Sequence, residues 1–119
     1  MLDMLIQGRR GMSLEDYAAV TSTNAAKLLG LYPRKGAIAV GSDADIAIID
    51  PAIKKTLRMA DLHVRDYSPW EGWQVEGWPT TVILRGKVMV ANGELLGSPG
   101  DGQLIPRKID PRVLRRPAF

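Results

Sequence analysis

The side chains best suited to bind a metal ion or move a proton lie around one histidine. His63 is the only histidine in the chain, and Asp61 and Asp66 flank it within the same short stretch. Imidazole and carboxylate groups are common metal ligands, but metal sites converge more ligands than one stretch of this kind provides. We favour a surface or packing role for His63 over a metal-binding role.

A second pair of carboxylates, Asp43 and Asp45, lies in the segment Gly41-Ser-Asp-Ala-Asp45. Two neighbouring carboxylates could bind calcium or take part in acid–base catalysis. The segment lacks the ligand spacing and the closing glutamate of an EF-hand loop. We therefore expect a structural role, in which Asp43 holds the turn through nearby amides and Asp45 stands at the entrance of a strand.

Neither a serine nucleophile nor a phosphate-binding loop is indicated. A catalytic serine needs a base within hydrogen-bond reach, and His63 is the one histidine that could serve. The glycine-rich segment at 97–102 lacks the lysine of a P-loop. The serines considered are Ser13, Ser22, Ser42, Ser68 and Ser98. We predict that this chain carries no catalytic, cofactor-binding or metal-binding residue and is inactive alone.

Aromatic residues gather in a stretch that contains Tyr67, Trp70, Trp73 and Trp78, interrupted by proline and glycine. Indole rings combine a broad apolar face with a polar edge, which suits packing, subunit contacts and ligand stacking. Packing of the loop onto its own or a neighbouring domain is the favoured role. Contact with another subunit and binding of a ligand such as a sugar stay open.

Composition indicates a soluble, globular, cytoplasmic protein. Apolar residues make up 45% and charged residues 24% of the 119 residues, which are ordinary values for a single domain. The chain has no cysteine, so disulfides and thiolate metal sites are excluded. No stretch approaches the roughly 20 apolar residues of a membrane-spanning helix, and we expect no membrane partner.

The net charge of +3 comes largely from the C-terminal end. A basic segment can bind a phosphate backbone, but this one lacks interleaved aromatic residues and a helix to present its charges. We expect no nucleic-acid partner and a basic arm that is solvated or contacts a subunit. Its basic residues are Arg107, Lys108, Arg112, Arg115 and Arg116.

Two short helices are predicted near the N-terminus. Ser13 with Asp16 has the form of a helix cap, so a helix should begin near Leu14. The polar run from Thr21 predicts a break and a fresh cap, followed by a second helix over 24–29. Gly30 and the following proline should end that helix.

About five short strands should follow. The predicted strand 44–50 is apolar on both faces, which is typical of a strand covered on two sides, and Asp-Pro should end it. A second strand is predicted over 53–57, and 80–84 pairs with 87–90 in a hairpin. Asn-Gly then predicts a turn into a last strand at 94–96. The expected fold class is α+β, mainly β.

The chain resembles the C-terminal region of cyclic amidohydrolases, the hydantoinase and dihydropyrimidinase family. The resemblance covers roughly residues 12–105. The segments that carry it are the continuous stretch from Thr21-Ser-Thr-Asn to Asp50, Asp66-Tyr-Ser-Pro-Trp-Glu-Gly-Trp, Gly77-Trp-Pro and Leu84-Arg-Gly-Lys-Val.

The resemblance implies a composite domain, the partial β-sandwich that accompanies a TIM-like barrel. It also implies a parent enzyme that opens cyclic amides with two zinc ions held by the barrel, which this chain lacks. On that basis 1–33 is a helical remnant of the last barrel unit, 34–97 a partial β-sandwich, and 98–119 an extended basic arm. Open sheet edges and the region of Trp70, Trp73 and Trp78 should then contact a second copy or a barrel-bearing chain.

The predicted function is that of a C-terminal structural fragment of such a hydrolase. The alternative is a free-standing, non-catalytic β-sandwich module that binds a ligand or another subunit. A regulatory subunit for a separate barrel chain is a third interpretation, which no residue favours over simple truncation.

Overall fold

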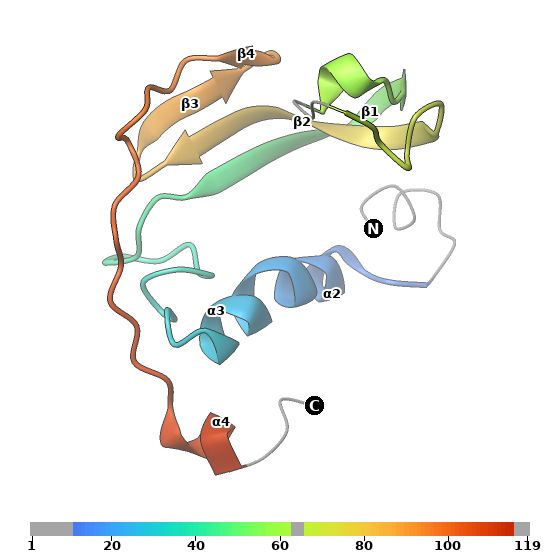
Figure 1. The fold of residues 1–119 in the computed structure, drawn as a ribbon. Coiled ribbons are helices and arrows are strands. Elements are labelled where there is room, and N and C mark those ends of the chain that lie inside the picture. Colours follow the sequence, from blue (N-terminus) through green and yellow to red (C-terminus); the bar gives the residue numbers. More distant parts are fainter. Residues whose placement is uncertain (1–10, 63–65, 116–119) are drawn as a thin grey trace.

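The computed structural model describes residues 11–62 and 66–115. The described chain has two parts, a helix and a four-stranded antiparallel sheet (Figure 1). Two segments without regular structure link them. We call residues 29–45 the connector and residues 96–110 the arm. Apolar surface can therefore be buried within the helix, within the sheet or between the two.

One continuous helix stands where two were predicted. It consists of α2 (Leu14–Ala18), the π-helical turn η1 (Ala19–Thr23) and α3 (Asn24–Leu28). Its predicted start is confirmed, because the amide of Asp16 donates to the hydroxyl of Ser13 at 3.1 Å. The carboxylate of Asp16 in turn accepts the Ser13 amide at 3.1 Å, which completes a capping box.

The polar residues from Thr21 lie in or next to the π-helical turn and do not cap a new helix. Thr23 keeps right-handed helical dihedrals (φ −63°, ψ −47°) and makes no side-chain cap. The hydroxyl of Thr21 donates to the carbonyl of Tyr17 at 2.7 Å. Threonine commonly makes such bonds to a carbonyl one turn back in a helix. The helix continues through the wider turn without a break.

Gly30 ends the helix as predicted, with a φ of 69° that favours glycine. The arm returns to this point, because the amide of Lys108 donates to the carbonyl of Gly30 at 3.1 Å. A β-carbon at position 30 would lie 2.5 Å from the carbonyl carbon of Lys108. Glycine is therefore required here both for the helix end and for the docking of the arm.

The sheet is a meander in which each strand pairs with the next. Its strands are β1 (Ile46–Thr56), β2 (Gln74–Leu84), β3 (Lys87–Ala91) and β4 (Glu94–Leu95), in spatial order β1-β2-β3-β4. The predicted hairpin at Arg85-Gly86 is confirmed. Both turn residues have positive φ, 48° and 83°, as a type I′ turn requires.

β1 joins two of the predicted strands into one. Asp50 pairs with Trp78 and Lys54 with Glu76, so the chain between Asp50 and Lys54 bulges out of the ladder. Pro51 falls inside that irregularity, where its missing amide donor disturbs no ladder hydrogen bond. The prediction that Asp-Pro ends the strand is therefore wrong, and five predicted strands become four.

Two short elements complete the described chain. The 3-10 turn η2 (Met59–Asp61) follows β1, and α4 (Pro111–Arg115) follows the arm. None of the helices in the described ranges is long and apolar enough to cross a membrane.

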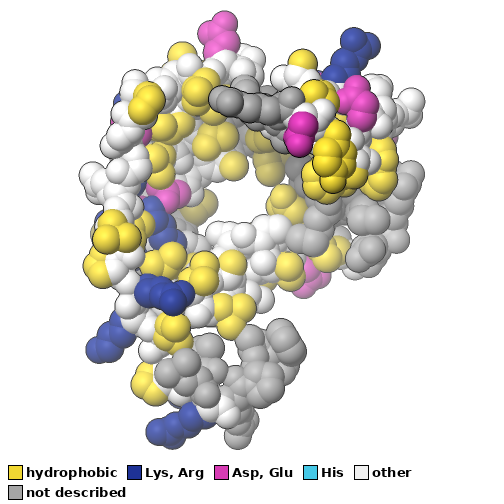
Figure 2. Space-filling model, viewed as in Figure 1, with side chains coloured by type: hydrophobic (Ala, Val, Ile, Leu, Met, Phe, Trp, Pro, Cys, Tyr) yellow, Lys and Arg dark blue, Asp and Glu magenta, His cyan; other side chains and the backbone are white. Residues whose placement is uncertain are grey.

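Few of the described residues are buried. Among the described residues only Ala26 and Leu57 are buried apolar residues, at 6% and 8% exposure. The accessible surface is 9225 Å², whereas a folded monomer of this mass exposes about 6300 Å². Figure 2 shows an opening between the helix and the sheet with hydrophobic side chains around it. The second sheet of the predicted sandwich is not among the described strands, so the sandwich stays a prediction.

Replacing Gly30 by alanine should both destabilise the chain and release the arm. The positive φ costs about 1 kcal/mol in an L-residue, and the collision with Lys108 adds to it. Trypsin should then cut after Lys108 faster than in the wild type. Urea unfolding and a tryptic time course measure the two effects.

Gly72→Ala is the matched control, because Gly72 has a φ of 79° but a β-carbon at this position would meet no atom within 4 Å. It should lose stability without exposing the arm. Equal tryptic rates in the two variants would contradict the docking of the arm on Gly30.

Candidate functional site

A cluster of charged side chains joins the connector to the sheet. Lys35 lies between two carboxylates, with its Nζ atom 2.8 Å from Asp43 and in hydrogen-bond contact with Asp45. Arg34 donates from Nε to the same Asp43 carboxylate at 3.0 Å. The backbone amide of Arg85, in the β2–β3 turn, donates to Asp45 at 2.8 Å. We call these residues the Lys35 cluster.

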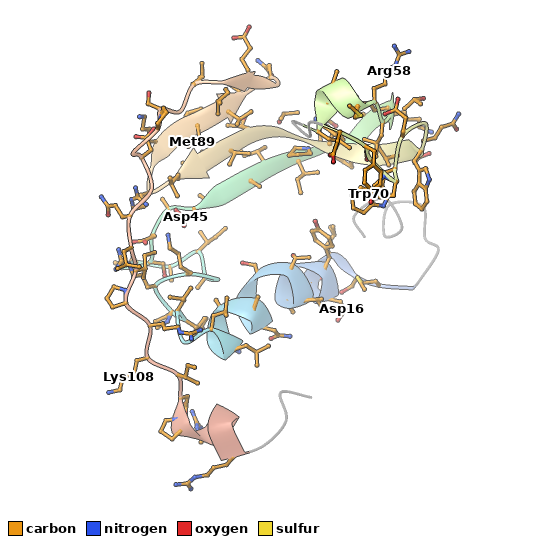
Figure 3. All side chains as sticks on the ribbon, viewed as in Figure 1. Asp16, Asp45, Arg58, Trp70, Met89 and Lys108 are labelled. Carbon is orange, nitrogen blue, oxygen red and sulfur yellow. The ribbon has the colours of Figure 1, made fainter. Side chains whose placement is uncertain are left out.

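Backbone hydrogen bonds hold the Lys35 cluster in place. The Lys35 amide donates to Leu31 at 2.9 Å and the Asp43 amide to Arg34 at 2.8 Å, so the connector folds back on itself. The Gly86 amide donates to Ala44 at 3.0 Å, which fixes the end of the connector to the hairpin. Figure 3 shows Asp45 at the end of the sheet opposite Trp70.

The ion pairs shift the pKa of each group toward its charged form. The hydrogen bond from Lys35 lowers the pKa of Asp43 below its ordinary 3.8. Partial burial opposes the same shift at Asp45, but the Lys35 and Arg85 hydrogen bonds outweigh burial and its pKa is also lowered. Burial likewise works against the charged form of Lys35, and its two carboxylate partners still raise its pKa above 10.5.

These carboxylates are unsuited to catalysis or calcium binding, because basic side chains already occupy their oxygens. A general acid needs a raised pKa, and both pKa values here are lowered. Within residues 11–62 and 66–115, no three His, Asp or Glu side chains form a group that could hold a metal ion. The described residues therefore do not fit a zinc pair, and His63 lies outside them.

The structure changes the expected role of Asp43. Its carboxylate binds the side chains of Arg34 and Lys35, whereas nearby amides were expected as partners. Asp45 does stand at the entrance of a strand, one residue before β1. The separation of Asp45 from Arg85 along the chain explains why local sequence rules do not reveal this contact.

A second set of contacts, which the sequence did not predict either, binds the arm to the β2–β3 hairpin. Lys87 contacts the Asp101 carboxylate at 2.8 Å, and the Ser98 amide donates to it at 2.7 Å. The Arg85 guanidinium also donates to the Asp101 carbonyl. The hydrogen bond from Lys87 leads the causes that lower the pKa of Asp101. The arm is thus held at Asp101 and again at Lys108.

The predicted tryptophan region divides into two environments. Trp78 lies in β2, and the Lys55 ammonium sits 4.4 Å from its ring centre in a cation–π contact. Trp70 and Trp73 lie in the loop before β2 and are 53% and 56% exposed. The loop is bound to the end of β1, because the Gly72 amide donates to Leu57 at 2.9 Å. Packing accounts for Trp78 and leaves two indoles free for contacts.

Four of the five serines make structural contacts. Ser13 caps the helix, Ser42 donates to the Pro33 carbonyl at 2.8 Å, and Ser68 accepts the Trp70 amide at 3.2 Å. Ser98 is held by Asp101 through its backbone. Ser22 lines a cavity between the helix and the sheet.

That cavity borders the Lys35 cluster. It has a volume of about 750 Å³ and lies between the helix and β1. Tyr17, Thr21 and Ala26 line it from the helix, and Ile46 and Ile49 line it from β1. Lys35, Asp43 and Asp45 close its polar end. A mainly apolar cavity whose charges are paired suits packing better than chemistry.

Lys35→Met should lower the free energy of unfolding by about 1 kcal/mol, since solvent screens part of each ion pair. Two carboxylates would lose their shared partner, and they would repel each other. Lys54→Met is the control, because Lys54 pairs with Glu76 at 3.1 Å but is 74% exposed. It should change stability by no more than about 0.5 kcal/mol. Urea unfolding at neutral pH compares the two, and equal losses would contradict the importance of the cluster.

Acid should weaken the same cluster. The folded pKa values of Asp43 and Asp45 are lowered, so their contribution is present above the ordinary value of 3.8 and is lost as pH falls through the folded values. Stability measured from about pH 5 down to about pH 2 should fall more steeply in the wild type than in Lys35→Met. Parallel pH profiles would show that other carboxylates dominate.

A family model places the chain among known proteins. The model described as "Amidohydrolase family" matches residues 1–89. A D-hydantoinase of Ralstonia pickettii is 44% identical over 98 residues, which is 82% of this chain and 21% of that protein. Dihydropyrimidinase 2 of Caenorhabditis elegans is 44% identical over 99 residues, or 82% of this chain and 19% of that protein.

Solved structures agree with the sequence comparisons. A structure of a D-hydantoinase matches 91% of this chain with a TM-score of 0.83 and 43% identity, and the match covers 24% of that chain. A dihydropyrimidinase from Brevibacillus agri matches 89% of this chain with a TM-score of 0.82 and 40% identity, again over 24% of its own length. The chain thus spans about a fifth to a quarter of these relatives. By its sequence and its fold, this chain belongs to the amidohydrolase family, with hydantoinases and dihydropyrimidinases as its relatives.

Proposed function

We propose that this chain is the non-catalytic, C-terminal structural part of a hydrolase that opens cyclic amides of the hydantoin or dihydropyrimidine type. The observation that carries the proposal is the mismatch in length. Nearly all of the chain matches hydantoinases at 43% identity, yet it accounts for only 24% of the matched structure. Its role is to stabilise the rest of the enzyme.

The chemistry of the described residues supports a structural role. Opening a cyclic amide at neutral pH calls for an activated water, and metal ions supply one by lowering its pKa. The Asp43 and Asp45 carboxylates are bound to basic side chains and are not available as metal ligands. The metal ions of the parent enzyme, two zinc ions by family resemblance, would be held by residues outside the described part.

The exposed surface supports the same proposal. An accessible surface of 9225 Å² exceeds that of a typical monomer of this mass by about 2900 Å². A standard interface takes about 800 Å² from each partner. The chain therefore has enough unburied surface for extensive contact with the remainder of a cytoplasmic enzyme or with further subunits.

A free-standing interaction module is the second candidate. The observation that favours it is the exposure of Trp70 and Trp73, at 53% and 56%. Tryptophan is enriched among residues that dominate binding energies. Such a module would bind its partner without the hydrolase remainder.

The purified chain should neither hydrolyse hydantoin or dihydrouracil nor retain stoichiometric zinc. Co-expression with the part of the Ralstonia pickettii D-hydantoinase that it does not match should instead give a co-purifying complex that hydrolyses hydantoin. Spectrophotometric assays and metal analysis measure both results. Turnover by the purified chain would refute the non-catalytic role, and stable binding to unrelated proteins without affinity for the hydrolase remainder would favour the module.

A further inference from the structure

The Asn92-Gly93 turn combines a reactive pair of residues with an open position at the edge of the sheet. It joins β3 to β4, and β4 is the outermost strand (Figure 1). Both turn residues are exposed and have positive φ, 50° and 86°. Within residues 11–62 and 66–115, the side chain of Asn92 makes no hydrogen bond. Its carboxamide is therefore free to react.

An asparagine followed by glycine can convert without an enzyme. The main-chain nitrogen of Gly93, once it has lost its proton to hydroxide, attacks the side-chain carbonyl carbon (Cγ) of Asn92. The new C–N bond closes a cyclic imide, and the side-chain nitrogen leaves as ammonia. Water then opens the imide. Opening at Cγ gives aspartate, whereas opening at the main-chain carbonyl gives isoaspartate, in which the main chain runs through Cβ and Cγ.

Glycine at position 93 removes the main steric obstacle to this attack. Ring closure requires the turn to leave its hairpin dihedrals, and glycine has the widest range of backbone dihedrals. A β-carbon at position 93 would meet no atom within 4 Å, so the space around the turn is open. β4 consists of two exposed residues and pairs, among the described strands, with β3 alone. Such an edge opens at a low cost in free energy, so the folded chain can reach the reactive geometry.

Asn24 provides the opposite case within the same chain. It is the only other asparagine in the sequence, and it is also exposed. It has helical dihedrals (φ −68°, ψ −40°) at the start of α3 and is followed by alanine. The helix fixes the backbone, and the β-carbon of Ala25 restricts the dihedrals that ring closure needs. The chain thus contains an asparagine of equal exposure that the structure holds unreactive.

Isoaspartate at position 92 is incompatible with the β3–β4 hairpin. The register of a hairpin is set by the length and type of its loop, and isoaspartate adds a methylene group to the main chain. The ladder between β3 and β4 consists of two pairs, Val90 with Leu95 and Ala91 with Glu94. Two pairs provide little to resist the longer loop, so β4 should separate from β3.

The start of the arm is held by the same hairpin. The amides of Leu96 and Gly97 donate to the carbonyl of Met89, a β3 residue, at 2.8 and 3.1 Å. Gly97 also lies against the Met89 side chain, because a β-carbon at position 97 would collide with its methyl group. Beyond this point the arm is held by Asp101, which Lys87 contacts at 2.8 Å. Loss of β4 should therefore release Leu96 and Gly97 first.

We propose that Asn92 is a site of spontaneous modification, at which conversion to isoaspartate detaches β4 and the start of the arm from β3. Water is the only co-reactant, ammonia is the product that leaves, and the rate rises with pH because the attacking nitrogen must lose its proton. The inference does not depend on the proposed function, since the turn, the arm and both asparagines belong to this chain.

The first test follows the chemistry in the full chain. The purified protein is aged in mildly alkaline buffer below its unfolding temperature, and its peptides are analysed by electron-transfer mass spectrometry, which distinguishes isoaspartate from aspartate. Asn92 should convert about tenfold faster than Asn24, because glycine and the open edge favour ring closure. Equal rates at the two asparagines would overturn the assignment of the site.

The second test follows the structure. Hydrogen exchange at the amides of Leu96 and Gly97, measured by NMR, should be about tenfold faster in the aged protein than in the fresh protein. Asn92→Gly keeps a residue suited to positive φ but cannot form the imide, so ageing should leave its exchange unchanged. Asn92→Asp has the charge of the product on a normal main chain, and it should exchange like the fresh wild type.

Three results of the second test would overturn the structural part of the inference. The first is unchanged exchange at Leu96 and Gly97 in protein whose Asn92 has converted to isoaspartate. The second is equally fast exchange in fresh Asn92→Asp, which would make charge the cause in place of the longer main chain. The third is faster exchange in aged Asn92→Gly, which would place the cause outside the turn.

Discussion

The structure depends on the Lys35 cluster, because the helix and the sheet do not pack broadly against each other. Lys35 belongs to the connector, and its two carboxylate partners lie directly before β1. Asp45 extends the cluster to the β2–β3 turn through the Arg85 amide. The arm supplies a second link, from Asp101 at the hairpin to Lys108 at the helix end. A few polar contacts therefore perform the positioning that a hydrophobic core performs in most small domains.

This arrangement explains why so many apolar residues are exposed. Ile38 and Val40 in the connector and Leu104 in the arm are almost fully exposed, at 89%, 108% and 97%. A small protein gains most of its stability from apolar burial, which must offset the entropy lost on folding. Polar links fix the relative position of two parts but bury little apolar surface. The exposed residues are thus consistent with an apolar partner surface supplied from outside the described residues.

Sequence rules succeeded where a few neighbouring residues determine the structure. The Ser13–Asp16 capping box, the helix end at Gly30 and the turns at Arg85-Gly86 and Asn92-Gly93 all follow from local backbone preferences. The same rules failed at Thr21, where they predicted a helix break, and at Pro51, where they predicted a strand end. The polar residues from Thr21 lie in a π-helical turn of a continuous helix. β1 pairs with β2 on both sides of Pro51 and so continues past the proline. Contacts between distant segments, such as Asp45 with Arg85, leave no short-range signal.

The candidate site was harder to predict, since its carboxylates could have served chemistry or architecture. Type and spacing alone left Asp43 and Asp45 open to both roles. Partners decide between them: a carboxylate paired with lysine and arginine has a lowered pKa and satisfied oxygens, and it cannot readily donate a proton or bind a cation. Lys35, Asp43 and Asp45, which close the polar end of the cavity, are all paired. The same ion pairs that remove these carboxylates from catalysis therefore fix the connector to the sheet, through Asp45 and the Arg85 amide.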